Sequence, residues 1–437
     1  MRQATWWRRL GVAVIATVVT LVAGAPEGRA ADITISYSDW QLAQDIWGKS
    51  LRDAIAEFEK QNPGIKVATE PVALGQRDVK YSTAIRGGKG PDVFALDANP
   101  VKQYIKEGWV KDLTPFIEKE GGKKWLEDFF PVTLRPVTEQ GKTYGVPKNT
   151  VAMVIVYNKQ MFQEAGVKPP KTWNDFREVS RKLTKATTPG GPIDQWGVTL
   201  VMAQASFDLR FSVVLRGFGG DFLTPDGKHS ALNTLEAKQA FTFIVDMINS
   251  DKSMPPGVTQ VDCNAARRLL ANKKIAMKIG TMWSMAEVSG MNPALDGWNV
   301  LDMTPIPQKE GVSKKVRSTL YQKSLFMNPN TPHPEAAWKL IKFLTDKKQM
   351  ERWFDDNNML SSRKSVNAQY APSKQSRFAA VVIPEIERAD FLPLIPQWPE
   401  ILETFRQALQ AAVAGTKPAE KALADAHNQI ESILARK

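Results

Sequence analysis

Carboxylates and tryptophans, more than cysteines or histidines, are the residues of this sequence that could build a site. Its 437 residues include one cysteine and three histidines, His229, His333 and His427. This scarcity excludes a cysteine-rich metal site and leaves little for a histidine-built catalytic centre. The sequence also lacks the glycine-rich phosphate loop, the dinucleotide fingerprint, the zinc-protease motif and the serine-hydrolase elbow. We therefore expect no cofactor, no metal ion and no catalytic residue.

Three carboxylates, Asp39, Asp45 and Asp97, allow two kinds of chemistry. A pair of carboxylates on the two sides of a glycosidic bond can hydrolyse it, which leaves a secreted glycan-degrading enzyme as an alternative. The simpler role is hydrogen bonding. A carboxylate or amide that accepts from hydroxyl groups, beside an aromatic ring that covers the C–H face of a sugar, holds a carbohydrate without reacting with it.

Three tryptophans could supply such rings. Trp40, Trp283 and Trp398 each follow or lie in a short strand or a proline-rich turn beside polar residues, which is where strand ends and loops face a cleft. Core packing is the alternative for each of them. Other tryptophans, such as Trp173 and Trp338, have the spacing of a buried helix face, and we expect them to be structural.

Strands and helices alternate in the part of the chain that must position these residues. Runs rich in β-formers at 33–37, 65–69 and 92–96 are separated by helical stretches, the first at 45–60. This order favours an α/β fold with a largely parallel sheet covered on both faces. Such sheets bind ligands beyond the carboxyl ends of their strands.

A second sheet is expected to begin at 151–157, because this run is apolar at nearly every position, as in a strand buried on both faces. Thr172 and Asp175 form a partial capping box for the helix that follows. An amphipathic pair at 401–414 and 418–435 closes the chain. Because no stretch has the composition of a linker, the chain is expected to cross between its domains more than once.

Residues 1–30 have the pattern of a secretory signal peptide. Early arginines precede sixteen apolar residues at 10–25, and Gly28 and Ala30 are small residues before a cleavage site. An uncleaved anchor is the alternative, but a membrane span usually needs about 20 apolar residues. The pair Arg8-Arg9 leaves twin-arginine export open beside the general route. We expect a periplasmic protein cleaved near Ala30.

The net charge of +12 does not indicate a nucleic-acid partner. The signal contributes four arginines and one glutamate, and the remaining 54 basic residues are dispersed among 45 acidic ones with no basic block. That distribution is typical of a solvated surface, so we expect no nucleic-acid binding. A small anionic ligand stays an alternative at this net charge.

Several segments, in a fixed order, resemble a known family. The longest are GKTYGVPKNTVAMVIVYNKQMF at 141–162 and PKTWNDF at 170–176. Shorter ones are AGV at 165–167, FEKQNPGIKV at 58–67, GPDVF at 90–94, GWVKDL at 108–113, AMKIGTMW at 276–283 and PEAAW at 334–338. Over essentially the whole chain after the signal, the sequence resembles the extracellular solute-binding proteins, family 1, of ATP-driven sugar importers, the group that includes maltose-binding protein.

The resemblance implies a two-lobed type II periplasmic binding protein fold. Each lobe is then a mixed sheet flanked by helices, and a hinge of about three segments joins the lobes. The crossings are expected near 146–151, 319–324 and 370–380. The first lobe is expected to comprise 32–147 plus 323–375, and the second 148–322 plus 376–437.

The same resemblance implies a ligand site in the cleft between the lobes. By matching positions, the ends of the first and third strands, the Pro-x-Asn-Thr turn and two late tryptophans supply most of its residues. Two further residues, Tyr321 near a crossing and Arg363, are candidates by position, although a surface salt bridge is an equal alternative for Arg363. The expected ligand-binding residues are Ser38, Asp39, Trp40, Asp97, Asn99, Asn149, Thr150, Trp283, Tyr321, Arg363 and Trp398.

The function implied is a monomeric, non-enzymatic receptor. It would close its lobes on a small carbohydrate and present it to the membrane permease subunits of an ATP-binding-cassette importer. Two alternatives stay open. One is a receptor for an anionic solute, such as a glycerol phosphate or a sugar acid, because Arg210, Arg363 and the net positive charge could offset an anion. The other is the glycan-degrading enzyme.

Overall fold

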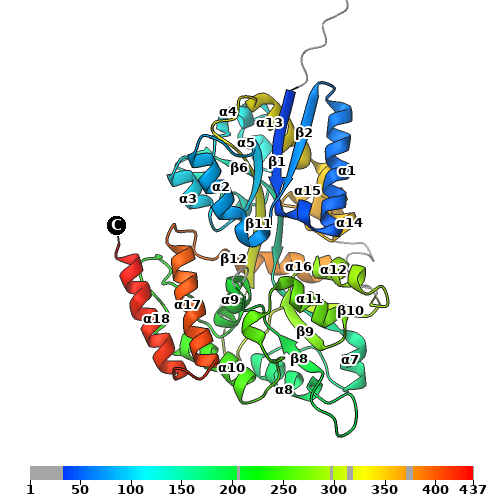
Figure 1. Ribbon diagram of the computed structural model, residues 1–437, viewed down its shortest axis with the longest axis vertical. Coiled ribbons are helices and arrows are strands. Elements are labelled where there is room, and N and C mark those ends of the chain that lie inside the picture. The colour runs from blue at the N-terminus through cyan, green and yellow to red at the C-terminus, as the bar shows by residue number, and fades with distance from the viewer. Residues whose placement is uncertain (1–32, 204–206, 296–298, 313–317, 371–376, 437) are drawn as a thin grey trace, which may run out of the picture.

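Two sheets, one above the other in Figure 1, organise the protein into two lobes. This arrangement is seen in a computed structural model that describes residues 33–203, 207–295, 299–312, 318–370 and 377–436. The expected signal peptide and its cleavage point lie outside the described residues. We call the upper lobe in the figure the first lobe and the lower one the second lobe.

The first lobe is built on a six-stranded sheet in which β1, β2 and β3 are parallel, as the alternation of strands and helices predicted. β11 lies between β3 and β6 and is antiparallel to both. The carboxyl ends of the parallel strands point toward the second lobe (Figure 1). The strands are β1 (Ile33–Asp39), β2 (Ile65–Pro71), β3 (Val93–Asp97), β6 (Gly145–Ala152), β11 (Ser318–Met327) and β12 (Ala389–Asp390).

The second lobe is built on a four-stranded sheet with the order β10-β7-β9-β8. All residues of β7 and β9 are buried, because helices cover both faces of the sheet, which explains why these strands are apolar at nearly every position. The strands are β7 (Val154–Asn158), β8 (Trp196–Thr199), β9 (Ile275–Gly280) and β10 (Leu301–Thr304); β4 (Thr138–Glu139) and β5 (Lys142–Thr143) form a separate hairpin.

Helices surround both sheets (Figure 1). Those of the first lobe are α1 (Asp45–Gln61), α2 (Arg77–Arg86), α3 (Val101–Lys106), α4 (Thr114–Lys119), α5 (Lys123–Leu126), α6 (Pro131–Leu134), α13 (Pro334–Leu344), α14 (Lys347–Asn357) and α15 (Lys364–Tyr370). Those of the second lobe are α7 (Lys159–Glu164), α8 (Trp173–Leu183), α9 (Phe207–Gly217), α10 (Leu235–Asn249), α11 (Cys263–Ala271), α12 (Ser284–Met291), α16 (Arg377–Glu387), α17 (Trp398–Val413) and α18 (Ala419–Leu434). Short 3-10 turns are η1 (Trp40–Ala43), η2 (Leu74–Gln76) and η3 (Val258–Gln260). None of the helices in the described ranges combines the length and apolar composition that a bilayer span needs.

Helix starts follow the capping chemistry of the sequence. Thr172 Oγ1 accepts a hydrogen bond from the Asp175 backbone N–H, and Asp175 accepts one from the Thr172 N–H, so the capping box before α8 is complete. The expected helix at 401–414 begins earlier, at Trp398, because Pro399 fits the first turn of a helix. Trp398 is therefore the first residue of α17 and does not lie in a turn.

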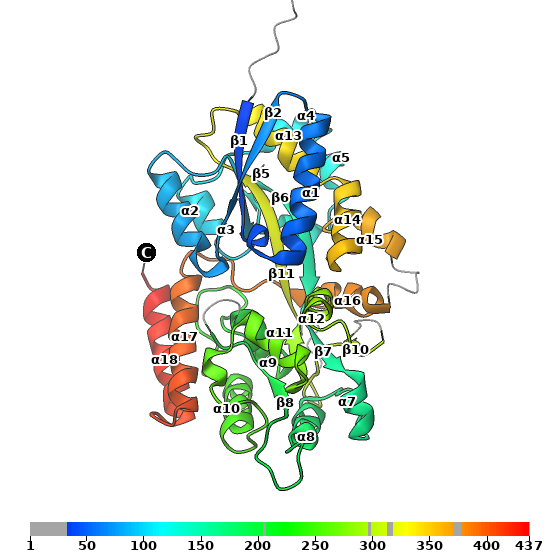
Figure 2. The same ribbon diagram turned by 45° about the vertical axis from the view of Figure 1, so that its right-hand side comes forward.

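Among the described residues, the strand segments β6–β7 and β11 connect the lobes, and β6 and β11 lie side by side (Figure 2). The expected strand at 151–157 is split, because β6 stays paired with β11 through Ala152 and the chain enters the second sheet after Met153. Met153 N–H donates to the Thr319 carbonyl at 3.0 Å, which ties the two segments together. Most of the third expected crossing, 370–380, falls outside the described residues.

Candidate functional site

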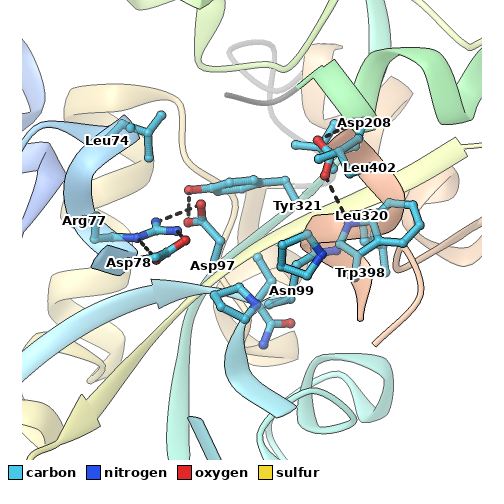
Figure 3. A pocket seen from close by; sticks show the side chains of 16 residues that line it. Leu74, Arg77, Asp78, Asp97, Asn99, Asp208, Leu320, Tyr321, Trp398 and Leu402 are labelled. Atoms are coloured by element: carbon cyan, nitrogen blue, oxygen red, sulfur yellow. Dashed lines mark hydrogen bonds and ion pairs between the residues drawn. The ribbon is translucent and has the colours of Figure 1, made fainter. Parts of the chain in front are cut away.

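Two adjoining cavities lie where the lobes meet, and they share the lining residues Leu74, Gly75, Leu209 and Tyr321. The first, of about 230 Å³, is lined by Asp97 and is called here the Asp97 cavity (Figure 3). The second, of about 400 Å³, is the Trp283 cavity. The shared residues come from the first lobe, the second lobe and the connecting strand β11. The two cavities therefore form one cleft with walls from both lobes.

Strand ends place most of the cleft residues. Asp97 is the last residue of β3, and Trp40 directly follows β1. Both strands belong to the parallel part of the first sheet, where a ligand site is expected at the carboxyl edge. From the second lobe, Trp283 follows the end of β9 by three residues. In both walls of the cleft, the end of a strand thus places the side chains that line it.

An ion pair and a short hydrogen bond fix Asp97 in its cavity (Figure 3). Its carboxylate accepts from Tyr321 Oη at 2.6 Å and pairs with Arg77 Nη1 at 2.8 Å, while Arg77 Nε donates to Asp78 at 2.8 Å. Burial alone would lower the pKa of Arg77, but Asp78 and Asp97 outweigh it and raise that pKa. Burial and then Asp97 raise the pKa of Tyr321. Both groups therefore keep their protons at neutral pH, where Tyr321 donates to Asp97 and Arg77 is ion-paired with it.

The opposite wall of the Asp97 cavity presents Asp208 and Trp398 from the second lobe (Figure 3). Trp398 Nε1 donates to Asp208 at 3.4 Å, and the Leu209 N–H donates to the same carboxylate at 2.8 Å. Burial raises the pKa of Asp208. Asn99 also lines this cavity, and its buried Nδ2 has no hydrogen-bond partner among the described residues. Polar groups thus face each other across the cavity.

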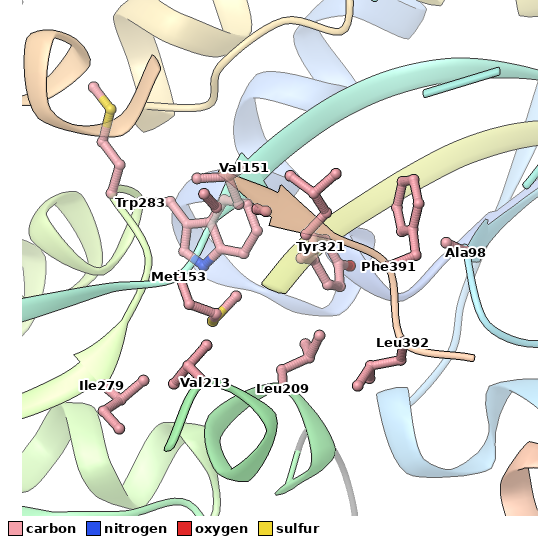
Figure 4. Close-up of a cluster of buried hydrophobic side chains, with 14 of the residues drawn as sticks. Ala98, Val151, Met153, Leu209, Val213, Ile279, Trp283, Tyr321, Phe391 and Leu392 are labelled. Atoms are coloured by element: carbon pink, nitrogen blue, oxygen red, sulfur yellow. The ribbon is translucent and has the colours of Figure 1, made fainter. Parts of the chain in front are cut away.

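Aromatic rings from both lobes line the Trp283 cavity. Trp40 and Trp47 of the first lobe meet edge to face at 5.1 Å between ring centroids, and Trp47 meets Trp283 of the second lobe at 5.9 Å. Trp283 in turn lies edge to face against Tyr321 at 5.1 Å. Figure 4 shows Trp283 and Tyr321 with Met153 at this junction. The rings form one continuous aromatic surface that crosses from lobe to lobe.

A family model supplies the decisive comparison. The model for the bacterial extracellular solute-binding proteins matches residues 44–351, which is most of the chain. The protein belongs to this family. The expectation from the sequence segments is therefore confirmed.

Individual relatives have low sequence identity to this chain, but the similarity covers most of both chains. The solute-binding protein described here is 25% identical over 403 residues to the diacetylchitobiose binding protein DasA of Streptomyces coelicolor, covering 89% of this chain and 85% of the relative. It is 24% identical to the galactooligosaccharide-binding protein of Bacillus subtilis, covering 85% and 84%. An ABC transporter solute-binding protein of Thermotoga lettingae, solved with alpha-D-tagatose, superposes with a TM-score of 0.81 at 24% identity over 92% of this chain and all of that one. The two-lobed fold is thus confirmed.

Of the eleven residues expected to bind ligand, six line the cleft. Their side chains come from the first lobe, the connecting strand and the second lobe, so the structure brings together residues that are far apart in the sequence. They are Trp40, Asp97, Asn99, Tyr321, Trp283 and Trp398.

Asp39 lies beneath the cleft in a buried ionic cluster and does not line either cavity. It accepts from Lys323 Nζ at 2.6 Å, Tyr37 Oη at 2.8 Å and the Gln41 N–H at 2.9 Å, and Lys148 Nζ lies 4.0 Å away. Although burial opposes ionisation, Lys323 and Lys148 hold the pKa of Asp39 below its ordinary value. Burial lowers the pKa of Lys323 to about 7 and that of Lys148 to about 8. We call Asp39, Lys148 and Lys323 the hinge cluster.

Three other expected residues are buried behind the cleft walls. Ser38 Oγ donates to the Glu70 carbonyl at 2.7 Å, and Thr150 Oγ1 lies 2.9 Å from Ser362 Oγ. Asn149 is 1% exposed, and within the described ranges neither side-chain amide atom has a hydrogen-bond partner. None of the three lines the two cavities.

Arg363 lines a different cavity, of about 570 Å³, in the first lobe. Its guanidinium pairs with Asp128 at 3.2 Å, donates from Nε to the Thr345 carbonyl at 2.9 Å and lies 4.2 Å from the centroid of the Phe129 ring. These contacts tie α15 to the neighbouring loops. Arg363 therefore makes a salt bridge, but it is buried and not on the surface as the alternative had it, because Arg363 is only 6% exposed.

Several cleft residues were not expected from the sequence, and some of them are charged. Examples are Trp47, Arg77, Asp208 and Arg267, whereas Arg210, which also lines the cleft, was expected only for an anionic ligand. They lie on helices, mostly at or near the first turn, where no strand end marks them. Arg77 could have been found from the sequence. It is the first residue of α2 and follows β2 after a short loop that contains η2, so a search of every loop between a strand and the next helix would have included it.

Proposed function

We propose that the protein captures a carbohydrate between its lobes and delivers it to the membrane permease of an ATP-binding-cassette importer. The observation that carries this proposal is the cleft, in which aromatic rings and polar side chains from both lobes face the same space. Family membership supports a solute receptor, and two distant relatives carry the names of oligosaccharides.

The chemistry of the cleft fits a sugar. A pyranose has apolar C–H faces and a rim of hydroxyl groups, which match aromatic rings and hydrogen-bonding side chains. The Trp283 cavity, about 400 Å³, lies in the range of 300–1,000 Å³ that small-molecule sites occupy. We assign Trp40, Trp283 and Tyr321 to ring contacts, and Asp97 and Asn99 to the hydroxyl groups.

The remaining expected residues receive other roles in this proposal. Trp398 orients Asp208 at the far wall through its indole N–H. Ser38, Asn149 and Thr150 support the cleft from behind, and Asp39 holds the turn that carries Trp40, because it accepts the Gln41 N–H at the start of η1. Arg363 stabilises the first lobe and makes no ligand contact.

Closure of the lobes is the mechanism that follows. A ligand that touches both walls favours the closed arrangement by its difference in affinity for the two states, whereas a ligand on one lobe alone shifts nothing. Contacts such as Trp47 with Trp283 already join the lobes across the cleft. The permease would then read the closed form, so the receptor needs no catalytic activity.

The proposal includes the organisation expected from the sequence. The expected division puts residues 32–147 with 323–375 in the first lobe and 148–322 with 376–437 in the second. Parts of β6 and β11, and all of β12, which pair in the first sheet, extend beyond these bounds, and the change of sheet at Met153 is the physical boundary near the first crossing. Residues 1–30 direct export to the periplasm, where the receptor acts as a monomer.

Thermal-shift and calorimetric titrations of the purified protein test the proposal. The panel contains mono-, di- and trisaccharides beside amino acids and dipeptides. We expect one saccharide, at 100 times its Kd, to stabilise the fold by about 2.7 kcal/mol and to be recovered intact. Stabilisation by another solute class alone would refute a carbohydrate receptor, and cleavage of the saccharide would establish an enzyme.

A pair of variants locates the site. Trp283→Ala is expected to lower saccharide affinity at least tenfold, because it removes the second-lobe ring that contacts Trp47 of the first lobe and Tyr321 of β11. Trp109→Ala is the control, since Trp109 packs on Tyr104 in the first lobe and does not line the two cavities. Equal losses in both variants would place the site elsewhere.

A further inference from the structure

Basic side chains gather on the second-lobe wall of the Trp283 cavity. Arg210 of α9 and Arg267 of α11 both line this cavity, although they are only 5% and 6% exposed. Lys278 of β9 lies behind them and is 1% exposed. Burial is the main cause that lowers the pKa of Lys278 to about 7, and the charges of Arg210 and Arg267 lower it further. We call these three residues the cleft cation group.

Carboxylates balance Arg267 and Lys278 weakly, whereas Arg210 interacts with the charge of Asp208. Glu287 lies 3.9 Å from Arg267 Nη1, and burial raises the pKa of Glu287, which reduces its charge. Asp262 also lines the cavity, but it is exposed at the start of α11, where its carboxylate accepts the Ala265 N–H at 2.6 Å. In the described part of the chain, Lys278 has no carboxylate within 4.0 Å, and its Nζ lies 3.4 Å from Ser284 Oγ.

The hydrogen bonds of Arg267 also leave room for a ligand. Its Nη1 donates to Asn264 Oδ1 at 2.8 Å, and its guanidinium lies 5.4 Å from the centroid of the Trp47 ring. Its buried Nε has no partner among the described residues. Buried donors without partners are rare in proteins because desolvation of a charged group is unfavourable unless an opposite charge or acceptor replaces water. An acceptor in the cavity would supply that partner.

The Asp97 cavity is different. There, Arg77 is flanked by Asp78 and Asp97, and Asp208 faces it from the second lobe. Acidic groups outnumber the basic one at that end of the cleft, whereas basic groups dominate at the Trp283 end. A ligand that spans the cleft would therefore meet opposite charges at its two ends.

We propose that the carbohydrate taken by this receptor is acidic, with a carboxylate or phosphate group held by Arg210 and Arg267 and a sugar ring directed toward Tyr321 and the Asp97 cavity. Arginine pairs with carboxylate and phosphate through two parallel hydrogen bonds, and a bound anion would favour the protonated form of Lys278 behind them. This inference rests on the proposed function, because it names the class of ligand for the same cleft.

Matched ligands test the inference. For glucose, galactose and mannose, calorimetry compares the neutral hexose, its uronate and its 6-phosphate. We expect one uronate or one 6-phosphate to bind at least 100-fold more tightly than the neutral parent, and its affinity to fall as the salt concentration rises. A preferred uronate identifies a carboxylate as the anion, and a preferred 6-phosphate identifies a phosphate.

Neighbouring arginines on α11 supply matched variants. Arg267→Gln should weaken the acidic sugar at least tenfold and leave the neutral parent unchanged, whereas Arg268→Gln, at an exposed position of the same helix, should change neither. Lys278→Met keeps the shape of the side chain and removes a buried charge, so it should fold even if Arg267→Gln does not. We expect it to weaken the acidic sugar three- to tenfold.

Two results would overturn the inference. If a neutral saccharide binds as tightly as its acidic forms, or if Arg267→Gln and Lys278→Met weaken neutral and acidic ligands equally, the cleft cation group does not bind an anion, while the proposed carbohydrate receptor stands. If no saccharide of either charge binds and another solute class does, the proposed function fails as well.

Discussion

Two buried groups of basic side chains flank the cleft, and they differ in what balances their charge. In the hinge cluster, Lys148 and Lys323 share Asp39, which lies 2.6 Å from Lys323 Nζ. In the cleft cation group, Glu287 lies no closer than 3.9 Å from Arg267. Both groups stack on tryptophans: Lys323 lies 4.1 Å from the Trp40 ring centroid, and Arg267 lies 5.4 Å from that of Trp47.

The difference separates a structural role from a binding role. A buried charge stays buried only with a partner. The hinge cluster finds its partner inside the fold, where strands β1, β6 and β11 meet, so it joins the first lobe to the strands that connect the lobes. In the cleft cation group, Arg267 borders a cavity, and its buried Nε has no partner among the described residues, so a ligand can supply one. The predictions below test this contrast, beginning with the largest expected effect.

Asp39→Asn should break the hinge cluster. Removal of the carboxylate leaves Lys148 and Lys323 buried without an opposite charge, and such a loss typically destabilises a protein by about 3–5 kcal/mol. Urea unfolding measures the change, and Asp53→Asn, at an exposed position of α1, is the control. A change below about 1 kcal/mol combined with lost ligand affinity would show that Asp39 contacts the ligand and does not support the fold.

Lys278 should make the stability of the unliganded protein depend on pH. Its folded pKa is about 7, whereas an unfolded lysine titrates near 10.4, so between these values the unfolded chain holds a proton that the folded protein lacks. The free energy of unfolding therefore rises with pH across this window. Between pH 7 and pH 10 the rise should be about 2–4 kcal/mol smaller in Lys278→Met than in the wild type.

The control for this measurement is Lys182→Met, at an exposed position of α8. It removes a lysine without altering a buried charge, so its pH profile should follow that of the wild type. If Lys278→Met also follows the wild type, Lys278 keeps an ordinary affinity for its proton, and the contrast between the two groups is wrong.

Gly290 of α12 should control how closely the cleft cation group approaches the first lobe. A Cβ atom at Gly290 would lie 2.7 Å from Ile46 Cδ1 of α1, so a large side chain there would act as a wedge between the lobes. Gly290→Phe is expected to lower saccharide affinity about tenfold, or 1.4 kcal/mol, without a ligand contact. Adding Ile46→Ala should restore part of the loss. An unchanged affinity in Gly290→Phe would contradict closure at this junction.

The sequence predicted the framework of the molecule better than the site. The parallel strands at 33–37, 65–69 and 92–96 and the capping box at Thr172 are confirmed, because local spacing and capping determine them. The break at Met153 was not predicted. The residues on both sides of it are equally apolar, and only the change of pairing partner from β11 to β9 reveals where the first sheet ends.

The candidate site shows the limit of arguing from strand ends. A strand end locates a residue at the edge of a sheet but does not say which way its side chain points. Trp40 and Asp97 face the cleft, whereas Ser38 and Asp39, from the same strand end as Trp40, point into the core. Arg267 was missed for the opposite reason, because its approach to the cleft depends on how α11 packs in the second lobe.

A crystal structure of the protein with a bound saccharide is the most direct test of the central claim that both lobes hold the ligand. The account predicts a sugar beside Tyr321 that contacts Asp97 or Trp40 of the first lobe and Trp283 or Arg267 of the second. A saccharide that contacts one lobe only, or that occupies the cavity of Arg363, would contradict it.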